Sequence, residues 1–433
     1  MIKFYPHQLE ALKLAEGRDR VAFYHDMGLG KTFTGAEQLV RYGKRVNLVV
    51  CQKSKIADWV DHFKSNYCQY HTFDLTKTTR IANNLKDYLG QVASGRFKVI
   101  GVINYELLFR RPELLELTDF TLMLDESSLI QNEKAKRTIF ILKMNPAKVI
   151  LLSGSPTGGK YERLWSQLKL LGMDASKTTF YNQYVNYHFE EYTPMVKTMV
   201  IDGYKNVDRL KRKMREYGCQ FLKTEEVMEL PAQIFTKIKV AASKDYHRFT
   251  KHKVVNMGAT ELVGDNTFKR LLYERELCGQ YSKEKLEAFK DLLESTNDRL
   301  IVFYNFNEEL DLLRPIVEDY GKGRPTSIVN GQYKGLYNYE KHDNSVTFVQ
   351  YQAGAMGLNL QKANKIIYYS PPLSSELYEQ SKKRTHRIGQ SNTCFYYNLI
   401  VKGSVEEKIY RVLAKRQNYT EALFEEDLQN EKI

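Results

Sequence analysis

Residues 21–40 read VAFYHDMGLGKTFTGAEQLV and contain, in succession, an apolar run, a glycine-rich turn and a helical pattern. The run VAFY is continuous rather than alternating, which is typical of a strand covered on both faces. Phe33, Ala36 and Leu39 fall on one face of the helical pattern that follows. This order predicts the first strand and helix of a parallel α/β sheet.

The turn HDMGLGKT (25–32) is close to the Walker A pattern G-x-x-x-x-G-K-[ST], with His25 in place of the first glycine. Its two glycines allow the backbone to fold closely around an anion at a helix N-terminus. The lysine can reach the β- and γ-phosphates of a nucleotide, and the threonine can hold Mg²⁺. The residues predicted to bind phosphate and metal are Gly28, Gly30, Lys31 and Thr32. A glycine-rich turn with an exposed lysine is the alternative.

A pair of carboxylates follows a second apolar run. FTLML (120–124) leads directly into Asp125 and Glu126. Downstream of a phosphate loop, a carboxylate at the end of a strand can hold Mg²⁺, and its neighbour can activate the attacking water. We therefore predict that Asp125 binds metal and that Glu126 activates water. The alternative is an ordinary acidic pair where a strand passes into a loop.

Phosphoryl transfer also requires positive charge around the transferring group. The segment EQSKKRTHRIGQ (379–390) supplies Arg384 and Arg387, a spacing that places both on one face of a helix. On its own this segment is equally consistent with a solvated basic helix.

Further apolar runs predict the remaining strands. They are residues 46–51, 97–103, 120–124 and 148–153 in the first third of the chain, and 299–304, 346–351, 365–369 and 393–400 near its end. Between these groups lies a stretch rich in Tyr, Lys and Arg that reads mostly as helix. The predicted organisation is a first lobe at 1–235 with a helical insertion at about 160–230, a linker at 236–280 and a second lobe at 281–433.

Composition restricts the partners and the compartment. The net charge is +13 over 433 residues, which suggests a polyanionic partner, but charge alone is equally consistent with a basic protein that is merely soluble. The five cysteines show no C-x-x-C spacing, so we expect no zinc site, no disulfide framework and a reducing, cytoplasmic location. No stretch approaches 18 consecutive apolar residues, and the N-terminus lacks the core of a signal peptide, so we expect no membrane contact.

These motifs resemble, in order and over nearly the whole chain, those of the superfamily 2 helicases, and specifically the Swi/Snf-like DNA translocases. DMGLGKT is very close to that family's motif I, which also lacks the first Walker glycine. The other matching segments are YPHQLEAL (5–12), LVVCQKSKIADW (48–59), VINYELL (102–108), LDESSLIQNEKAKR (124–137), LLSGSPTGGKYERLWSQLKLL (151–171), FLKTEEVMELP (221–231), LIVFYNF (300–306), QAGAMGLNLQKANKIIYYSPP (352–372) and QSKKRTHRIGQ (380–390).

The resemblance implies two RecA-like lobes that hydrolyse ATP with Mg²⁺ and move along double-stranded DNA. It implies that Gln8 reads adenine, and that Arg384 and Arg387 act as arginine fingers from the second lobe. Residues that would couple the nucleotide state to the nucleic acid are Ser153, Ser155, Gly354, Gly357, Asn359 and Gln380.

The resemblance also places DNA across several of these motifs, where phosphate contacts require Lys, Arg, polar side chains and backbone N–H groups. Candidates in the first lobe are Lys53, Ser54, Lys55, Asn104 and Tyr105. A second candidate patch consists of Arg209, Lys211, Arg212, Lys213 and Arg215, which could equally be a solvated helix face.

One departure keeps other functions open. Ser128 stands where motif II of the family usually ends in histidine, so coupling between motifs is in question. The alternatives are a helicase that separates or anneals strands of branched DNA, and a nucleotide-switched module that grips DNA and hydrolyses slowly. An RNA helicase is a further reading, disfavoured by the sequence HRIGQ. A recruiting protein of unidentified kind is a further expected partner.

Overall fold

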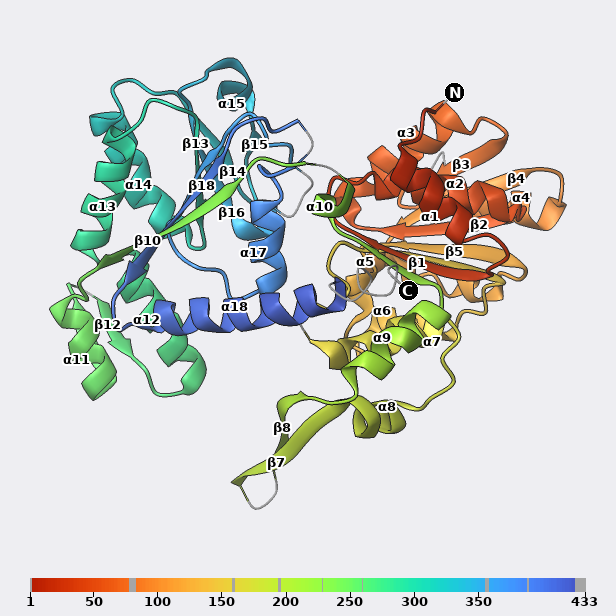
Figure 1. The fold of residues 1–433 in the computed structure, drawn as a ribbon, viewed down its shortest axis with the longest axis horizontal. Coiled ribbons are helices and arrows are strands. Elements are labelled where there is room, and N and C mark those ends of the chain that lie inside the picture. The colour runs from red at the N-terminus through yellow and green to blue at the C-terminus, as the bar shows by residue number, and fades with distance from the viewer. Residues whose placement is uncertain are drawn as a thin grey trace. The chain divides into compact units, whose positions relative to one another are not determined.

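The computed structural model describes residues 2–77, 83–157, 160–193, 196–227, 229–258, 260–354, 358–387 and 389–424. The side chains of 192–198, 334, 353–357 and 416–424 lie outside the description. The chain divides into two compact units at residue 228 (Figure 1). Each unit is built around a largely parallel sheet covered by helices, which confirms the predicted α/β fold class.

The first unit contains a parallel sheet with the strand order β3-β4-β2-β5-β6-β1-β9 among the described residues. Its strands are β1 (Arg20–His25), β2 (Val46–Cys51), β3 (Tyr70–Asp74), β4 (Lys98–Asn104), β5 (Phe120–Asp125), β6 (Lys148–Leu152) and β9 (Cys219–Leu222). Every strand predicted in the first third of the chain is present. The sequence did not predict β3 or β9, because β3 is partly exposed and polar and β9 is only four residues long.

Helices cover both faces of this sheet. They are α1 (Pro6–Leu14), α2 (Lys31–Tyr42), α3 (Ile56–Asn66), α4 (Asn84–Ser94), α5 (Tyr105–Leu108), α6 (Lys136–Lys143) and α10 (Thr224–Val227). Alternate residues of β1 enter different cores: Val21 and Phe23 pack in one cluster, and Ala22 and Tyr24 in the other. Burial on both faces explains why the strand is a continuous apolar run.

The segment predicted as a helical insertion contains α7 (Trp165–Leu170), α8 (Lys177–Tyr184) and α9 (Val207–Glu216). It also contains an antiparallel hairpin that the sequence did not predict, formed by β7 (Val185–Thr193) and β8 (Val196–Tyr204). Figure 1 shows this hairpin extending away from the rest of the first unit. Phe189 and Met199 lie opposite each other on it and are 59% and 36% exposed.

The sheet of the second unit has the order β10-β18-β17-β13-β16-β14-β15, and among the described residues only the β14–β15 pair is antiparallel. Its strands are β10 (Gln233–Val240), β13 (Leu300–Tyr304), β14 (Thr326–Val329), β15 (Lys334–Gly335), β16 (Val346–Gln350), β17 (Lys365–Tyr368) and β18 (Cys394–Val401). Its helices from residue 283 onward are α13 (Lys283–Glu294), α14 (Asn307–Tyr320), α15 (Tyr337–Lys341), α16 (Tyr351–Gly354), α17 (Ser375–Lys382) and α18 (Val405–Phe424).

Residues 236–280, predicted as a linker, belong to the second of the two compact units. They contain most of β10, and then α11 (Lys244–His252), β11 (Val254–Met257), β12 (Thr260–Val263) and α12 (Thr267–Gly279). Strand β10 pairs with β18 over its whole length. Phe249 and Leu277 share a buried cluster with Phe303 of the central strand. The predicted lobe boundaries at 235 and 281 stay predictions.

Among the described residues, no helix has the length and apolar character that crossing a bilayer requires.

The hairpin provides a test of local electrostatics. The His188 imidazole lies 2.9 Å from Asp202 and 3.4 Å from Glu190. The hydrogen bond to Asp202 raises the pKa of His188, and Glu190 adds to this effect. The stabilising contribution of this pairing is therefore complete below the unfolded pKa of about 6.5 and is lost as the pH rises through the folded value.

We predict that Asp202→Asn lowers the pKa of His188 in an NMR titration, whereas Asp208→Asn, which lies outside the hairpin, leaves it unchanged.

Candidate active site

The glycine-rich loop joins β1 directly to α2. Gly28 and Gly30 adopt left-handed φ values of 91° and 73°, and Lys31 is the first residue of α2. A Cβ added to Gly30 would lie 2.3 Å from Gln8 Nε2, so a larger residue there would displace the Gln8 side chain. His25 is the last residue of β1 and pairs with Leu222 of β9. Because the chain is still a regular strand at His25, no glycine is needed at that position.

Helix α1 holds the loop from one side. Gln8 is buried, and its amide donates to the carbonyl oxygens of Gly30 at 3.2 Å and Leu29 at 3.4 Å. The His7 imidazole lies 3.1 Å from the same Leu29 oxygen. Burial lowers the pKa of His25 to about 3, so its imidazole is neutral at physiological pH. The predicted contact of Gln8 with adenine stays a prediction.

The ammonium group of Lys31 lies within the loop. Its Nζ donates to the carbonyl oxygens of His25 at 2.8 Å and Asp26 at 3.1 Å. A Cβ added to Gly154 would lie 3.5 Å from this Nζ, so the segment after β6 passes close to the lysine. The Asp26 carboxylate is buried and accepts from Thr224 N and Oγ1, both at 3.2 Å.

Asp125 ends β5 and is held by two aromatic side chains. Trp59 Nε1 donates to its Oδ2 at 2.8 Å, and the Tyr105 hydroxyl donates to its main-chain oxygen at 2.8 Å. Burial raises the pKa of Asp125, against the opposing effects of the Trp59 hydrogen bond and the positive charge of Lys31. The site therefore brings together the predicted lysine and the predicted metal-binding carboxylate.

Glu126 has a left-handed φ of 53°. Few residues other than glycine adopt this conformation, and such strain is often found at functional positions. The turn directs the chain out of β5 and into the short 3₁₀ segment Ser127–Ile130.

Gln167 of α7 connects three parts of the first unit. Its Oε1 accepts from the Tyr24 hydroxyl of β1 at 3.0 Å and from the Ser127 hydroxyl at 2.8 Å. Its Nε2 donates to the Pro156 carbonyl oxygen at 2.7 Å. Strand β1, the turn after β5 and the loop after β6 are thus tied together by one buried amide. Ser128, beside Ser127, is also buried.

The predicted coupling residues occupy both units. In the first, Ser153 is buried and its Oγ accepts from Ser155 N at 3.1 Å. In the second, Gln380 of α17 donates to Glu376 at 3.4 Å, and Gly354 ends α16. Gly357 lies outside the described residues.

The two candidate arginines lie beyond the helix on which they were predicted. Helix α17 ends at Lys382, and Arg384 and Arg387 occupy the turns that follow. Gln390 stabilises this non-helical path by donating to the carbonyl oxygens of Gln361 at 3.0 Å and Ala363 at 2.9 Å. Arg384 is buried. The predicted placement on one helical face is therefore wrong.

Arg387 is oriented by a predicted coupling residue. Its guanidinium donates to Asn359 Oδ1 at 2.5 Å. Burial lowers the pKa of Arg387 from its usual value. A partly buried cation held by a side-chain amide is a fixed source of positive charge.

The candidate DNA contacts of the first unit separate into exposed and buried groups. Lys53 and Ser54 are exposed, and Lys55 pairs with Asp58 at 2.7 Å. Asn104 is buried and donates to Glu106. Tyr105 is fully buried with its hydroxyl bound to Asp125, so its side chain is not available to a nucleic acid, contrary to the prediction.

The basic residues of α9 do not form a single patch. Arg209 and Arg212 are exposed and Arg215 is half-buried. Lys213 pairs with Glu216 at 2.5 Å. Lys211 is buried, which removes it from the predicted patch, because the helix packs Leu210, Lys211 and Met214 inward.

Sequence reasoning missed the residues that support the site. No role was predicted for Trp59, Gln167, Thr224 or His7. Trp59 lies in a quoted motif, 48–59, and an indole N–H needs a partner when it is buried. The indole N–H of Trp59 could therefore have predicted a polar contact. Its partner, Asp125, could not be predicted, because only the order of the strands in the sheet brings the two residues together.

We predict that Gln167→Leu, which keeps the side-chain volume, lowers the free energy of unfolding by about 2 kcal/mol, since it leaves buried polar groups unpaired. Chemical denaturation followed by fluorescence measures the change. Gln183→Leu, on the half-buried surface of α8, is the matched control and should change stability little. Equal stability of the Gln167→Leu variant and the wild type would contradict the proposed role of the buried amide.

Comparisons with known proteins identify the family of this chain. A model described as "SNF2-related domain" matches residues 7–283, and one described as "Helicase conserved C-terminal domain" matches residues 284–389. The chain is 22% identical to the mouse (Mus musculus) chromodomain-helicase-DNA-binding protein 1-like, with 92% of this chain and 47% of that protein covered. It is 23% identical to the putative ATP-dependent helicase/translocase YwqA of Bacillus subtilis, with 93% and 46% covered.

A solved structure of the Sulfolobus solfataricus SWI2/SNF2 ATPase core in complex with dsDNA is similar at a TM-score of 0.45 and 18% identity, covering 97% of this chain and 92% of that one. The chain spans less than half the length of the curated relatives named above. The first family model alone matches more than half of the chain, and so the chain belongs to the SNF2-related family.

Proposed function

We propose that this chain is an ATP-dependent motor that hydrolyses ATP and moves along double-stranded DNA. The observation that carries the proposal is that Lys31, in a glycine loop at a helix N-terminus, and the half-buried strand-end carboxylate of Asp125 lie at the same edge of one parallel sheet. Family membership and the name of the Bacillus subtilis relative, an ATP-dependent helicase/translocase, support the choice of ATP and of movement. The net charge of +13 and the DNA-binding name of the mouse relative support the choice of DNA.

The loop suits the phosphates of ATP. The backbone N–H groups at the start of α2 and the Lys31 ammonium group would bind the anionic oxygens. At Gly30 the absence of a Cβ allows Gln8 of α1 to pack directly against the loop. Thr32 and Asp125 provide the hydroxyl and carboxylate oxygens that Mg²⁺ prefers, and the ion would supply charge neutralisation on the phosphates.

Glu126 is the proposed general base for the attacking water. Glu126 follows Asp125 directly. Its left-handed backbone conformation turns the chain away from the direction of β5. Trp59 and Tyr105 keep the neighbouring carboxylate and its main-chain oxygen fixed, so the base lies on a rigid support. Arg384 and Arg387 are the proposed cations for the charge on the transferring phosphoryl group.

For the DNA contacts we retain the residues that the structure leaves accessible. Lys53 and Ser54 follow β2, and Arg209 and Arg212 lie on the exposed face of α9. Lysine and arginine contacts with phosphate release counterions, so binding should weaken steeply with salt. Such contacts carry little sequence information, as a motor that moves along DNA requires.

The test is steady-state ATP hydrolysis at fixed salt with no nucleic acid, single-stranded DNA, blunt duplex DNA or double-stranded RNA. We expect blunt duplex to stimulate most. Lys31→Ala and Glu126→Gln should abolish hydrolysis and keep salt-sensitive duplex binding, because neither residue is placed on the DNA contacts. Normal turnover by either variant would contradict the active-site assignment. Nucleotide-dependent duplex binding with almost no stimulated hydrolysis would instead indicate a switch that only grips DNA.

Arg387 gives a second prediction. Arg387→Ala should keep the affinity for ATP and lower kcat by about 10³-fold, the effect expected for a cation that acts mainly on the transition state. Arg314→Ala, which removes an exposed arginine paired with Glu318 on α14, is the matched control and should leave kcat unchanged. An unchanged kcat in the Arg387 variant would assign that residue to structure alone.

A further inference from the structure

The indole of Trp59 holds the carboxylate of Asp125 directly. Trp59 lies on α3 and is only 1% exposed, and its Nε1 donates to Asp125 Oδ2 at 2.8 Å. A buried indole N–H needs an acceptor, but a main-chain carbonyl oxygen would satisfy it at a smaller desolvation cost than a carboxylate. Packing alone therefore does not explain why this N–H ends on an acid at the end of β5.

Trp165, the other tryptophan of the chain, shows the ordinary arrangement. It is the first residue of α7, and its Nε1 donates to the main-chain oxygen of Ala175 at 3.1 Å. This hydrogen bond joins the helix to the segment that follows it and involves no charged group. Both indoles lie in the first unit and make hydrogen bonds of similar length, but only that of Trp59 ends on a proposed metal ligand.

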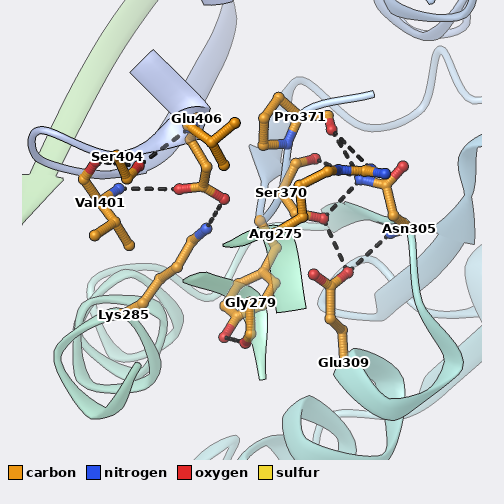
Figure 2. A network of polar contacts seen from close by, with 12 residues as sticks. Arg275, Gly279, Lys285, Asn305, Glu309, Ser370, Pro371, Val401, Ser404 and Glu406 are labelled. Atoms are coloured by element: carbon orange, nitrogen blue, oxygen red, sulfur yellow. Dashed lines mark hydrogen bonds and ion pairs between the residues drawn. The ribbon is translucent and has the colours of Figure 1, made fainter. Parts of the chain in front are cut away.

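The charge of Asp125 is oriented without being neutralised. Buried charges in proteins are either paired or bound to metal. Glu406 in the second unit shows the paired arrangement: its Oε1 lies 2.5 Å from Lys285 Nζ, and its Oε2 accepts from Val401 N at 2.9 Å (Figure 2). Asp125 makes no ion pair with any residue that the structure describes, and the N–H that holds its side chain is neutral. Such a carboxylate keeps its charge for an external cation.

Helix α3 also contacts the segment that carries the second proposed metal ligand. His62 lies one turn after Trp59, and the two rings meet edge-on with centroids 6.2 Å apart. His62 in turn meets Phe33 edge-on at 4.8 Å. Phe33 directly follows Thr32 at the start of α2. One helix thus contacts both elements that carry the proposed Mg²⁺ ligands, Thr32 and Asp125.

We infer that Trp59 is a positioning residue for Mg²⁺, acting through the carboxylate of Asp125. Its N–H binds Oδ2 and orients the carboxylate, and Oδ1 is the oxygen that we assign to the ion. Loss of a group that orients a metal ligand in this way typically weakens metal binding by about 10- to 100-fold. The inference rests on the proposed function, in which Asp125 holds Mg²⁺ together with a nucleotide. It assigns to Trp59 the strength of metal binding and no contact with the nucleotide.

The test is the Mg²⁺ dependence of nucleotide binding by Trp59→Phe, which keeps an aromatic ring and removes the N–H. A fluorescent, non-hydrolysable ATP analogue is titrated in EDTA and then at increasing Mg²⁺ concentrations. We expect the Mg²⁺ concentration that gives half of the tightening to rise about tenfold, and the affinity in EDTA to stay within about twofold of the wild type. A loss of packing alone would lower the melting temperature and the fraction of active protein, and would leave the Mg²⁺ dependence of the folded fraction unchanged.

Trp165→Phe is the matched control. It removes an indole hydrogen bond of similar length from the same unit without touching Asp125. We expect it to lower the melting temperature and to leave the Mg²⁺ dependence as in the wild type. An equal shift of the Mg²⁺ dependence in both variants would indicate general loosening of the unit and would overturn the inference.

The native Trp59 provides a second measurement, which does not require that Trp59→Phe folds. With Trp165→Phe in place, Trp59 is the only indole in the chain. Excitation of an indole moves electron density away from its nitrogen, so a carboxylate beside that nitrogen lowers the energy of the emitted light. Mg²⁺ on Asp125 would offset this charge. We therefore expect the emission to shift to shorter wavelength when Mg²⁺ is added to the nucleotide complex, and Asp125→Asn in the same background to abolish the shift.

The outcomes separate the inference from the proposed function. If Mg²⁺ tightens nucleotide binding by the wild type, an unchanged Mg²⁺ dependence in Trp59→Phe would overturn the inference alone. An emission of Trp59 that does not respond to Mg²⁺ in the nucleotide complex would do the same. A wild type that binds no nucleotide, or binds it equally well with and without Mg²⁺, would overturn the proposed function, and the inference with it.

Discussion

Parallel strands bring all their carboxyl ends to one edge of a sheet, and this constraint organises both units of the chain. In the first unit that edge carries the glycine loop after β1 and the carboxylate that ends β5. In the second it carries Asn305 after β13 and Ser370 after β17. Residues far apart in sequence lie together at this edge because each one directly follows its own strand. The buried body of each strand is apolar, so the polar groups concentrate at this edge.

Buried polar groups at such an edge need partners, and a few side-chain amides supply them. Gln167 satisfies two hydroxyls and a carbonyl in the first unit, and Gln390 satisfies carbonyls around the arginine turn in the second. An amide can donate and accept at once, which suits it to joining loops of different strands. The proposed catalytic residues thus lie beside loops that buried amides hold in place.

The parts that follow from local sequence could be predicted, and those that depend on tertiary contacts could not. Strand β1, its loop and α2 were predictable because apolar runs, glycines and helical spacing act within a few residues. The pair Asp125 and Glu126 was predictable for the same reason. The end of α17 at Lys382 was not, because Gln390, which lies beyond the helix, stabilises the turn by hydrogen bonds to carbonyl oxygens of another loop. The folded state of 236–280 likewise depends on pairing with β18, which lies far along the chain.

The histidine in the loop shows how tertiary structure permits a departure from a local pattern. A glycine at the start of a phosphate loop eases the turn out of the strand. Here β9 extends the pairing of β1 as far as His25 and Leu222, and Asp26 N continues the ladder by donating to Leu222 O at 2.9 Å. The chain therefore turns only after Asp26, where Gly28 and Gly30 supply the left-handed conformations. A strand contributed from almost two hundred residues downstream thus determines where the turn begins, and it makes the missing glycine compatible with an intact loop.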